Sequence, residues 1–297
     1  MTSAYAMVRQ QFGVSIGQFE GVQEALARIG GLTYTLESCR LMTAGAIDLK
    51  LSPSVVTAIA KYHMTEMGRT VMNDAMDIHS GKGIQVGPNN YLAHGYMGIP
   101  VSITVEGANI LTRNLMIFGQ GATRCHPFVL KEMEAAAMED DDAALEQFDG
   151  LLMNHILFAA SNAGMAFVHG LTRSYFAKAP VGGETAIYYK QLSRMSRGLA
   201  ICTDVAMLML GGELKRKEMI SARLGDVLSH LYLASTVLKR YEDEGRQQAD
   251  LPFVKYAIEN SLFEIGQAFN GFFKNFSNPV VNFILKRIVF PLGNHYH

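Results

Sequence analysis

The chain has 297 residues, of which 49% are hydrophobic and 18% are charged, and its formal net charge is −1. This composition predicts a packed globular protein of one large or two ordinary domains and excludes a disordered chain. A nearly neutral chain with scattered basic residues lacks the electrostatic signature of nucleic-acid binding, so we expect no nucleic-acid partner.

Cysteine content and hydropathy indicate the cellular compartment in which the chain is expected. The three cysteines, Cys39, Cys125 and Cys202, are widely spaced and odd in number, which favours neither a disulfide framework nor a zinc site. A reducing, cytoplasmic location is therefore expected. The first residues carry no signal-peptide pattern, and we expect no helix that spans a membrane, because no run of about 20 uncharged apolar residues stands out.

Helical periodicity dominates the first part of the chain. Phe19, Val22, Leu26 and Ile29 recur at three- and four-residue spacing, which predicts one apolar helix face. Ser52-Pro53 is typical of a helix start, and the predicted helix runs from residue 53 to about residue 77. It ends at a glycine-rich loop, residues 79–90.

Strand signals are weak. Residues 99–105 alternate in hydrophobicity but have no partner strand, so we expect extended coil that leads into a helix after Glu106. Residues 138–147 are acidic and predict an exposed segment between helices. Leu224, Val227, Leu228, Leu231 and Tyr232 trace another helix face. The predicted fold class is all-α, with a helical bundle over residues 1–125 and an additional helical domain over 126–297.

Motifs for metal binding or nucleophilic catalysis are missing from the sequence. No HExxH, His-x-His or repeated ExxH spacing connects the seven histidines before residue 290, and no GxSxG is present. We therefore predict no metal site and interpret the histidines as surface or core residues. The histidines in question are His63, His79, His94, His126, His155, His169 and His230.

Two local features have more than one interpretation. The loop "GKGIQVGP" lacks the GK[ST] of a phosphate-binding loop, so it is either a ligand contact or a simple helix end. Glu106 either stabilises a helix start through the helix dipole or acts as a base. Ile103 and Val105 favour the second reading by desolvating the carboxylate, and Gly107 leaves the backbone open to a flat ligand.

Three segments together carry a family resemblance. Residues 8–29 contain Arg-x-x-Phe-Gly, residues 74–84 read "DAMDIHSGKGI", and residues 105–113 read "VEGANILTR". These segments resemble the C-terminal helical domain of acyl-CoA dehydrogenases. The segment "TVEGANILTRNLMIFGQGATRCHP" and the helical region after it look similar to members of the large bacterial branch of acyl-CoA dehydrogenases in fatty-acid β-oxidation.

The resemblance implies roles for individual residues. Glu106 would be the catalytic base that removes the α-proton of an acyl-CoA thioester, beside Gly107 as a substrate contact. Arg9 stands where the family contacts the FAD diphosphate of a neighbouring subunit, and Phe12 would lie against the same nucleotide. Gly81 and Gly83 would let the backbone approach FAD closely. Departures from the family pattern are Asp77, Ser80, Val105 and Ala108, and Asp77 is expected to point away from the diphosphate.

The implied activity is FAD-dependent α,β-dehydrogenation of fatty acyl-CoA to trans-2-enoyl-CoA. The implied partners are acyl-CoA, an electron-transferring flavoprotein and further copies of the chain. Because the family carries two domains before this segment, we expect a C-terminal portion that by itself binds FAD poorly and turns over little or no substrate. The alternative is a non-catalytic helical interaction module.

The final segment has a membrane alternative. Residues 272–293 are apolar, with interspersed Lys274, Lys286 and Arg287, and two prolines break the run. Packing onto the bundle is one interpretation. Peripheral contact with the inner membrane face is the other.

Overall fold

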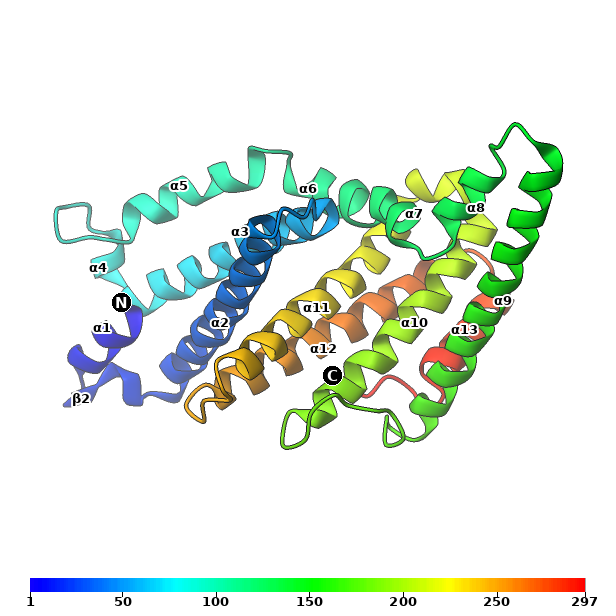
Figure 1. The fold of residues 1–297 in the computed structure, drawn as a ribbon. Coiled ribbons are helices and arrows are strands. Elements are labelled where there is room, and N and C mark those ends of the chain that lie inside the picture. The colour runs from blue at the N-terminus through cyan, green and yellow to red at the C-terminus, as the bar shows by residue number, and fades with distance from the viewer. Residues whose placement is uncertain (297) are drawn as a thin grey trace. The chain divides into compact units, whose positions relative to one another are not determined.

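A computed structural model describes residues 1–296, with the backbone alone for residues 120 and 124. The described chain is helical nearly throughout, which confirms the all-α prediction (Figure 1). It divides into two compact units. The first comprises residues 1–112 and 233–259, and the second comprises residues 113–232 and 260–296 of the described chain. The predicted domain boundary between residues 125 and 126 stays a prediction.

The first unit is built on two long helices that pack along each other, α2 (Glu20–Asp48) and α3 (Ser54–His79). The predicted helix from residue 53 is confirmed as α3. Further along, α5 runs back along α3 (Figure 1). The remaining elements before residue 112 are α1 (Thr2–Val8), β1 (Gln10–Gln11), β2 (Val14–Ser15), η1 (Ile16–Gln18), α4 (Gly81–Ile84), α5 (Ala93–Thr104) and α6 (Asn109–Leu111).

The prediction of extended coil over residues 99–105 is wrong, because α5 is helical through Thr104. The β-branched residues and Pro100 of α5 lower the local helix propensity, but tertiary packing outweighs this unfavourable propensity. Gly68 on α3 faces α5, and a methyl group on Gly68 would lie 3.7 Å from the Ile99 side chain, in ordinary van der Waals contact. Ile99 and Ile103 of α5 are half-buried and serve helix packing, whereas Met97 and Val101 are exposed.

Two contacts tie α2 into its unit. Arg28 donates two hydrogen bonds of 2.7 Å to the buried carboxylate of Asp74 on α3. Gly31 faces the Tyr256 ring of α12 (Leu251–Asn275), so close that a methyl group on Gly31 would lie 2.0 Å from a ring carbon. The glycine is thus required by helix packing, since any side chain would collide with the tyrosine.

In the second unit, α9 (Asp141–Leu171) packs against α8, α10 and α13. Its core is aromatic and includes the fully buried Phe269, Phe272 and Phe290. Arg113 donates to both oxygens of Asp226 and joins η2 to α11. The other bounds are η2 (Thr112–Gln120, π-helical), α7 (Gly121–Cys125), α8 (Val129–Ala135), α10 (Ala186–Leu210), η3 (Gly211–Lys215), α11 (Glu218–Asp243) and α13 (Pro279–Val289).

The final segment combines both interpretations made from the sequence. Leu285 and Val289 of α13 are buried, which is the predicted packing onto the helices. Phe283 and Ile284 are exposed on its other side. A membrane contact through these residues stays a prediction.

One helix corrects the expectation about membrane spans. By length and composition alone, α9 could cross a membrane. The sequence reading missed it because polar residues such as Asn154 and Ser161 interrupt a stretch that carries no Asp, Glu, Lys or Arg between residues 149 and 173. A core helix passes the same test, so the finding is weak evidence for a span.

Candidate functional site

A pocket of about 1090 Å³ lies in the first unit, where α1 and the β1–β2 hairpin meet the end of α3. It brings together Arg9, Phe12 and Gly81, three of the residues singled out in the sequence. The pocket is lined by Tyr5, Val8, Arg9, Gln10, Gln11, Phe12, Ile16, Phe19, Val22, Asp77, Ile78, His79, Ser80, Gly81, Lys82 and Gln85. Residues 70 positions apart in the sequence thus share one cavity.

The hairpin presents Arg9 and Phe12 at this pocket. Its two-residue turn, Phe12-Gly13, has positive φ at both positions, 54° and 82°, which is the geometry that matches the twist of short hairpins. The Phe12 side chain is 94% exposed. A large aromatic ring held in water on a constrained turn is available for contact with a ligand.

On the opposite wall, the end of α3 is fixed by aromatic contacts. Tyr5 stacks on His79 with ring centroids 4.1 Å apart. His79 Nδ1 donates to the carbonyl of Ala75 at 2.8 Å, and the Tyr91 hydroxyl donates to Nε2. Burial lowers the pKa of His79, so this ring is a neutral anchor.

Gly81 and Gly83 have different surroundings in the structure. A methyl group on Gly81 would meet nothing within 4 Å, so its backbone is open to the pocket. Gly83 is buried and does not line the pocket, since a methyl group there would lie 3.3 Å from the Met76 sulfur. The expected loop is also helical here, because α4 begins at Gly81.

Charge in the pocket comes from Arg9, Lys82 and Asp77. Asp77 also lines the cavity, like Gly81. The expectation that its carboxylate points away from the diphosphate stays a prediction. Two cations against one carboxylate still leave a net positive lining, which suits an anionic group such as a diphosphate.

Glu106 lies elsewhere in the same unit, in the turn between α5 and α6. Its φ is +56° and that of Gly107 is +90°, so the chain reverses through two left-handed residues. Lys61 on α3 holds this turn by donating to the Gly107 carbonyl oxygen at 2.6 Å and to the side-chain oxygen of Asn109. The amide of buried Asn109 in turn donates to Thr65 and Glu66.

The predicted apolar setting of Glu106 is not formed by this chain. Glu106 and Val105 are both exposed, so the Glu106 carboxylate is in contact with water. Sequence neighbours do not bury a carboxylate unless another element covers the turn. Glu106 and Gly107 are also absent from the pocket lining.

The Glu106 turn and the pocket contact different parts of α3. Lys61, which holds the turn, and His79, which lines the pocket, are 18 residues apart on this helix, which corresponds to about 27 Å.

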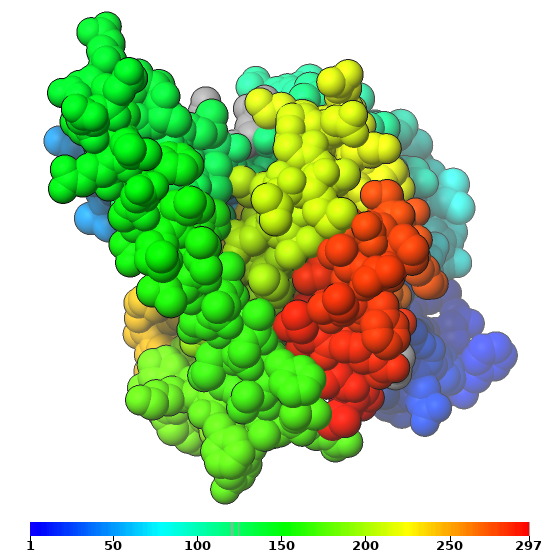
Figure 2. Space-filling model, turned by 90° about the vertical axis from the view of Figure 1, so that its right-hand side faces the viewer, coloured from blue at the N-terminus to red at the C-terminus, as the bar shows by residue number. Residues whose placement is uncertain are grey.

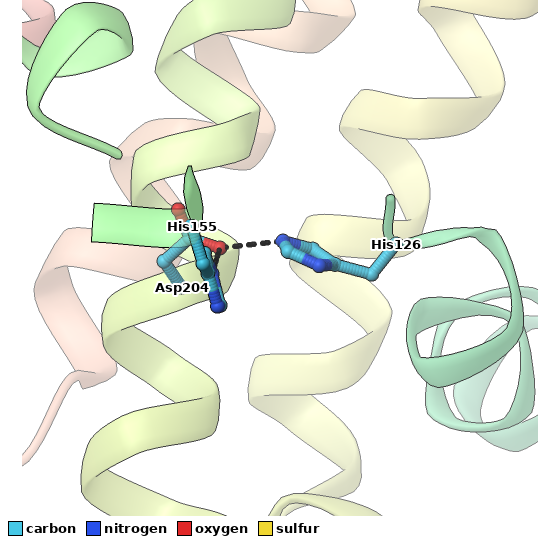
Figure 3. A group of neighbouring side chains, drawn as sticks. All are labelled: His126, His155 and Asp204. Atoms are coloured by element: carbon cyan, nitrogen blue, oxygen red, sulfur yellow. Dashed lines mark hydrogen bonds and ion pairs between the residues drawn. The ribbon is translucent and has the colours of Figure 1, made fainter. Parts of the chain in front are cut away.

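The second unit contains a polar cluster that sequence reasoning missed. His126 Nε2 lies 2.7 Å from Asp204 Oδ1, and His155 Nε2 lies 3.4 Å from the same oxygen (Figure 3). His155 Nδ1 donates to Glu132 at 2.8 Å. No sequence spacing connects these residues, since their distances along the chain are set by helix lengths.

Hydrogen bonding shows what this cluster does. His126 Nδ1 accepts from the backbone N–H groups of Phe128 and Val129, each at 3.2 Å, and so caps the start of α8. The His126 proton is therefore on Nε2, where it is donated to Asp204. The donor set could bind a divalent ion, and the three donor atoms lie within 4.8 Å of one another. A metal ion on His126 Nε2 would move the ring proton to Nδ1, which could then no longer accept the hydrogen bonds that cap α8. The geometry therefore favours a hydrogen-bond network with a structural role over a metal site.

Two family models match the chain, one over each of two segments that leave out residues 119–122. The description "Acyl-CoA dehydrogenase, C-terminal domain" matches residues 1–118, and "Acyl-CoA dehydrogenase, C-terminal, bacterial type" matches residues 123–297. The chain belongs to the acyl-CoA dehydrogenase family. The resemblance inferred from Arg9, the Gly81 segment and Glu106 is thereby confirmed. The roles of these individual residues stay predictions.

Acyl-CoA dehydrogenase relatives are distant in sequence. The chain is 22% identical over 249 residues to "Probable acyl-CoA dehydrogenase FadE10" of Mycobacterium bovis and of Mycobacterium tuberculosis. The matched part is 80% of this chain and 37% of those proteins, so the chain spans well under half of their length.

A solved structure has the same fold. It is an acyl-CoA dehydrogenase complexed with FAD from Bacillus anthracis, with a TM-score of 0.70 and 17% sequence identity. The match covers 97% of this chain and 48% of that chain. At this identity the comparison establishes the fold of the acyl-CoA dehydrogenase C-terminal region.

Proposed function

We propose that the chain forms the C-terminal helical portion of an FAD-dependent dehydrogenase that converts fatty acyl-CoA thioesters to trans-2-enoyl-CoA in fatty-acid β-oxidation. Family membership supports the dehydrogenase class. The observation that carries the proposal is the pocket in which Arg9, Phe12 and Gly81 meet, since the family resemblance implies that all three residues contact the flavin nucleotide.

FAD fits the chemistry of this pocket. Arg9 would pair with the diphosphate through a bidentate guanidinium contact, and Lys82 adds a second positive charge. The exposed Phe12 ring would pack against a flat group, and the open backbone at Gly81 permits close approach. Gly83 contributes through packing against Met76.

Glu106 is the proposed catalytic base, with Gly107 beside the substrate. Its carboxylate would take the α-proton of the thioester. Bound FAD would accept the hydride that leaves the β-carbon. A carboxylate in water is too weak a base for this proton, so catalysis requires a covering element that excludes water from the turn. The hydrogen bond from Lys61 fixes the turn on the side that faces α3, and the Glu106 side chain stays accessible.

The arrangement also supports a homo-oligomer. The Glu106 turn and the Arg9 pocket are held near opposite ends of α3, about 27 Å apart by helix rise. We therefore assign them to different flavins in the assembly, in agreement with the neighbouring-subunit role that the family resemblance implies for Arg9. An electron-transferring flavoprotein is the proposed electron acceptor. The proposed location is cytoplasmic, with peripheral contact at the inner membrane face.

The first experiment measures FAD binding to the purified chain by fluorescence quenching and isothermal titration. We expect weak binding that Arg9→Gln reduces at least tenfold, because the diphosphate loses its bidentate partner. Arg173→Gln, an exposed arginine outside the pocket, is the matched control. Equal affinity of wild type and Arg9→Gln would exclude the pocket as the flavin site.

The second experiment tests the base in flavin-loaded protein. Glu106→Gln should abolish acyl-CoA dehydrogenation while flavin absorbance is retained, and exposed Glu213→Gln should leave both unchanged. Activity that survives in Glu106→Gln would remove this residue from catalysis. Because catalysis requires an element that covers the Glu106 turn, the assay is decisive in protein that carries this element. Flavin-loaded protein with a covered turn and no dehydrogenase activity would favour the alternative function, a non-catalytic helical interaction module.

A further inference from the structure

The outer face of α9 is an exposed apolar surface. Met153, Ile156 and Leu157 are 59%, 54% and 60% exposed. Spacings of three and four residues place Ala160, Gly164, Phe167 and Leu171 on the same side. Figure 2 shows α9, in green, uncovered along most of its length. We call this set of residues, 153–171 on the exposed side, the α9 face.

The α9 face is a contiguous apolar patch of a few hundred Å², the size class that often marks a functional surface. Residues 153–171 of α9 extend about 28 Å. A strip about 10 Å wide along this length is roughly 280 Å² per molecule. Two such strips bury roughly 560 Å² together, so the charged ends of the helix must add contact area before the pair reaches the roughly 1,000 Å² of weak specific interfaces.

The charges at the two ends of α9 indicate which kind of molecule covers the α9 face. Asp142, Glu146 and Asp149 lie exposed on the first turns, on the same side as the α9 face. Exposed Arg173 follows the last turn, and exposed Lys178 comes shortly after. A second copy in antiparallel orientation places the acidic end of each helix beside the basic end of the other, with both copies using the same surface.

The side chains also fit each other in this orientation. We propose that two copies of the chain associate through the α9 face as an antiparallel pair with Ala160 on the twofold axis. In this register Ile156 of one copy lies opposite Gly164 of the other, and Met153 lies opposite Phe167. A methyl group on Gly164 would meet nothing within 4 Å, so this glycine leaves open space for a large neighbour. Large residues thereby face small ones near the axis.

A lipid surface is the less suitable occupant. Helices that bind anionic membranes carry Lys and Arg on their polar side. Here the exposed side of α9 begins with three carboxylates, Asp142, Glu146 and Asp149, which an anionic surface would repel. The self-association is independent of the flavin chemistry proposed above, so either proposal can fail without the other.

Sedimentation and light scattering over a concentration series give the first test. Wild type should show a concentration-dependent association step that doubles its mass, and Ile156→Glu should lack this step because it would bury a charge at the interface. Met165→Glu, on the flank of the same helix, is the matched control and should dimerise like wild type. Both residues are exposed, so neither change disturbs the core. A wild-type monomer at every concentration would overturn the proposal.

Cysteine cross-linking tests the register, in a Cys125→Ser background that removes the exposed cysteine. The double variant Ile156→Cys, Gly164→Cys should cross-link between copies with a short bis-maleimide, as should Ala160→Cys alone. Ile156→Cys alone should not, since its two copies are about 12 Å apart along the axis. No cross-link in the double variant, or pelleting of monomers with vesicles of anionic phospholipid, would contradict the antiparallel pair.

Discussion

The ammonium group of Lys61 lies 2.6 Å from the carbonyl oxygen of Gly107, the residue that follows Glu106. One helix thus holds the turn that carries the proposed base. The turn needs such a support, because Glu106 has positive φ, a conformation that costs a non-glycine residue about 1 to 2 kcal/mol.

Replacing Lys61 with Met should loosen this turn. The carbonyl of Gly107 and the side chain of Asn109 lose a charged donor, which destabilises the protein by about 2 kcal/mol. Hydrogen exchange should become faster between residues 104 and 112. The exposed Lys131→Met provides the control. Unchanged exchange in Lys61→Met would show that the turn is held by its own backbone.

Glycine positions within α2 should respond in opposite directions to alanine. Gly31→Ala should lower the free energy of unfolding by about 2 kcal/mol, because the new methyl group collides with Tyr256. Gly45→Ala meets nothing within 4 Å and should raise it by about 0.5 to 1 kcal/mol through helix propensity. Urea denaturation measures both. A stabilising Gly31→Ala would mean that the tyrosine ring moves without cost.

Loss of His126 should destabilise the second unit. In His126→Ala the start of α8 loses its cap and the partly buried Asp204 loses its donor, for a combined cost of about 2 to 3 kcal/mol. The exposed His94→Ala should have little effect. We also expect that a chelator leaves the melting temperature unchanged, since the network needs no ion. A chelator-induced drop of several degrees would reverse our interpretation of this cluster.

The pH dependence of stability should report His230. Burial lowers the pKa of this histidine from 6.5 to about 4. Between these values the unfolded chain binds a proton that the folded chain does not, so stability rises with pH. The contribution, about 3 kcal/mol, is complete above pH 6.5 and is lost as the pH falls to 4.

His230→Gln should therefore have a shallower loss of stability below pH 6.5 than His94→Gln, in which the substituted histidine is exposed. His79 and His169 also have lowered pKa values because of burial and contribute in the same direction in both variants. Parallel pH profiles for the two variants would show that His230 is protonated in the folded protein.

Local pattern was sufficient for several features of this protein. The helical spacing of Phe19, Val22 and Leu26 and the Ser52-Pro53 start predicted α2 and α3, because amphipathic periodicity and helix starts are properties of neighbouring residues. The segments around Arg9, Gly81 and Glu106 were enough to indicate the family. The proximity of Arg9, Phe12 and Gly81 was only an implication of that resemblance.

Other features depend on residues that are far apart in the chain. Residues 99–105 lack strong helix propensity, and the packing of α5 along α3 decides their structure. The exposure of Glu106 could not follow from Ile103 and Val105, because burial is set by whatever covers a turn and not by its sequence neighbours.

The sequence by itself determined that the chain is all-α, that it belongs to this family, and that Glu106 is a candidate base, since these depend on periodicity and short motifs. Only the tertiary structure decided that Lys61 supports the Glu106 turn, that His126, His155 and Asp204 meet, and that α9 leaves an apolar face in water. The physical reason is that helix packing brings together residues whose separation in sequence carries no information about their distance in space.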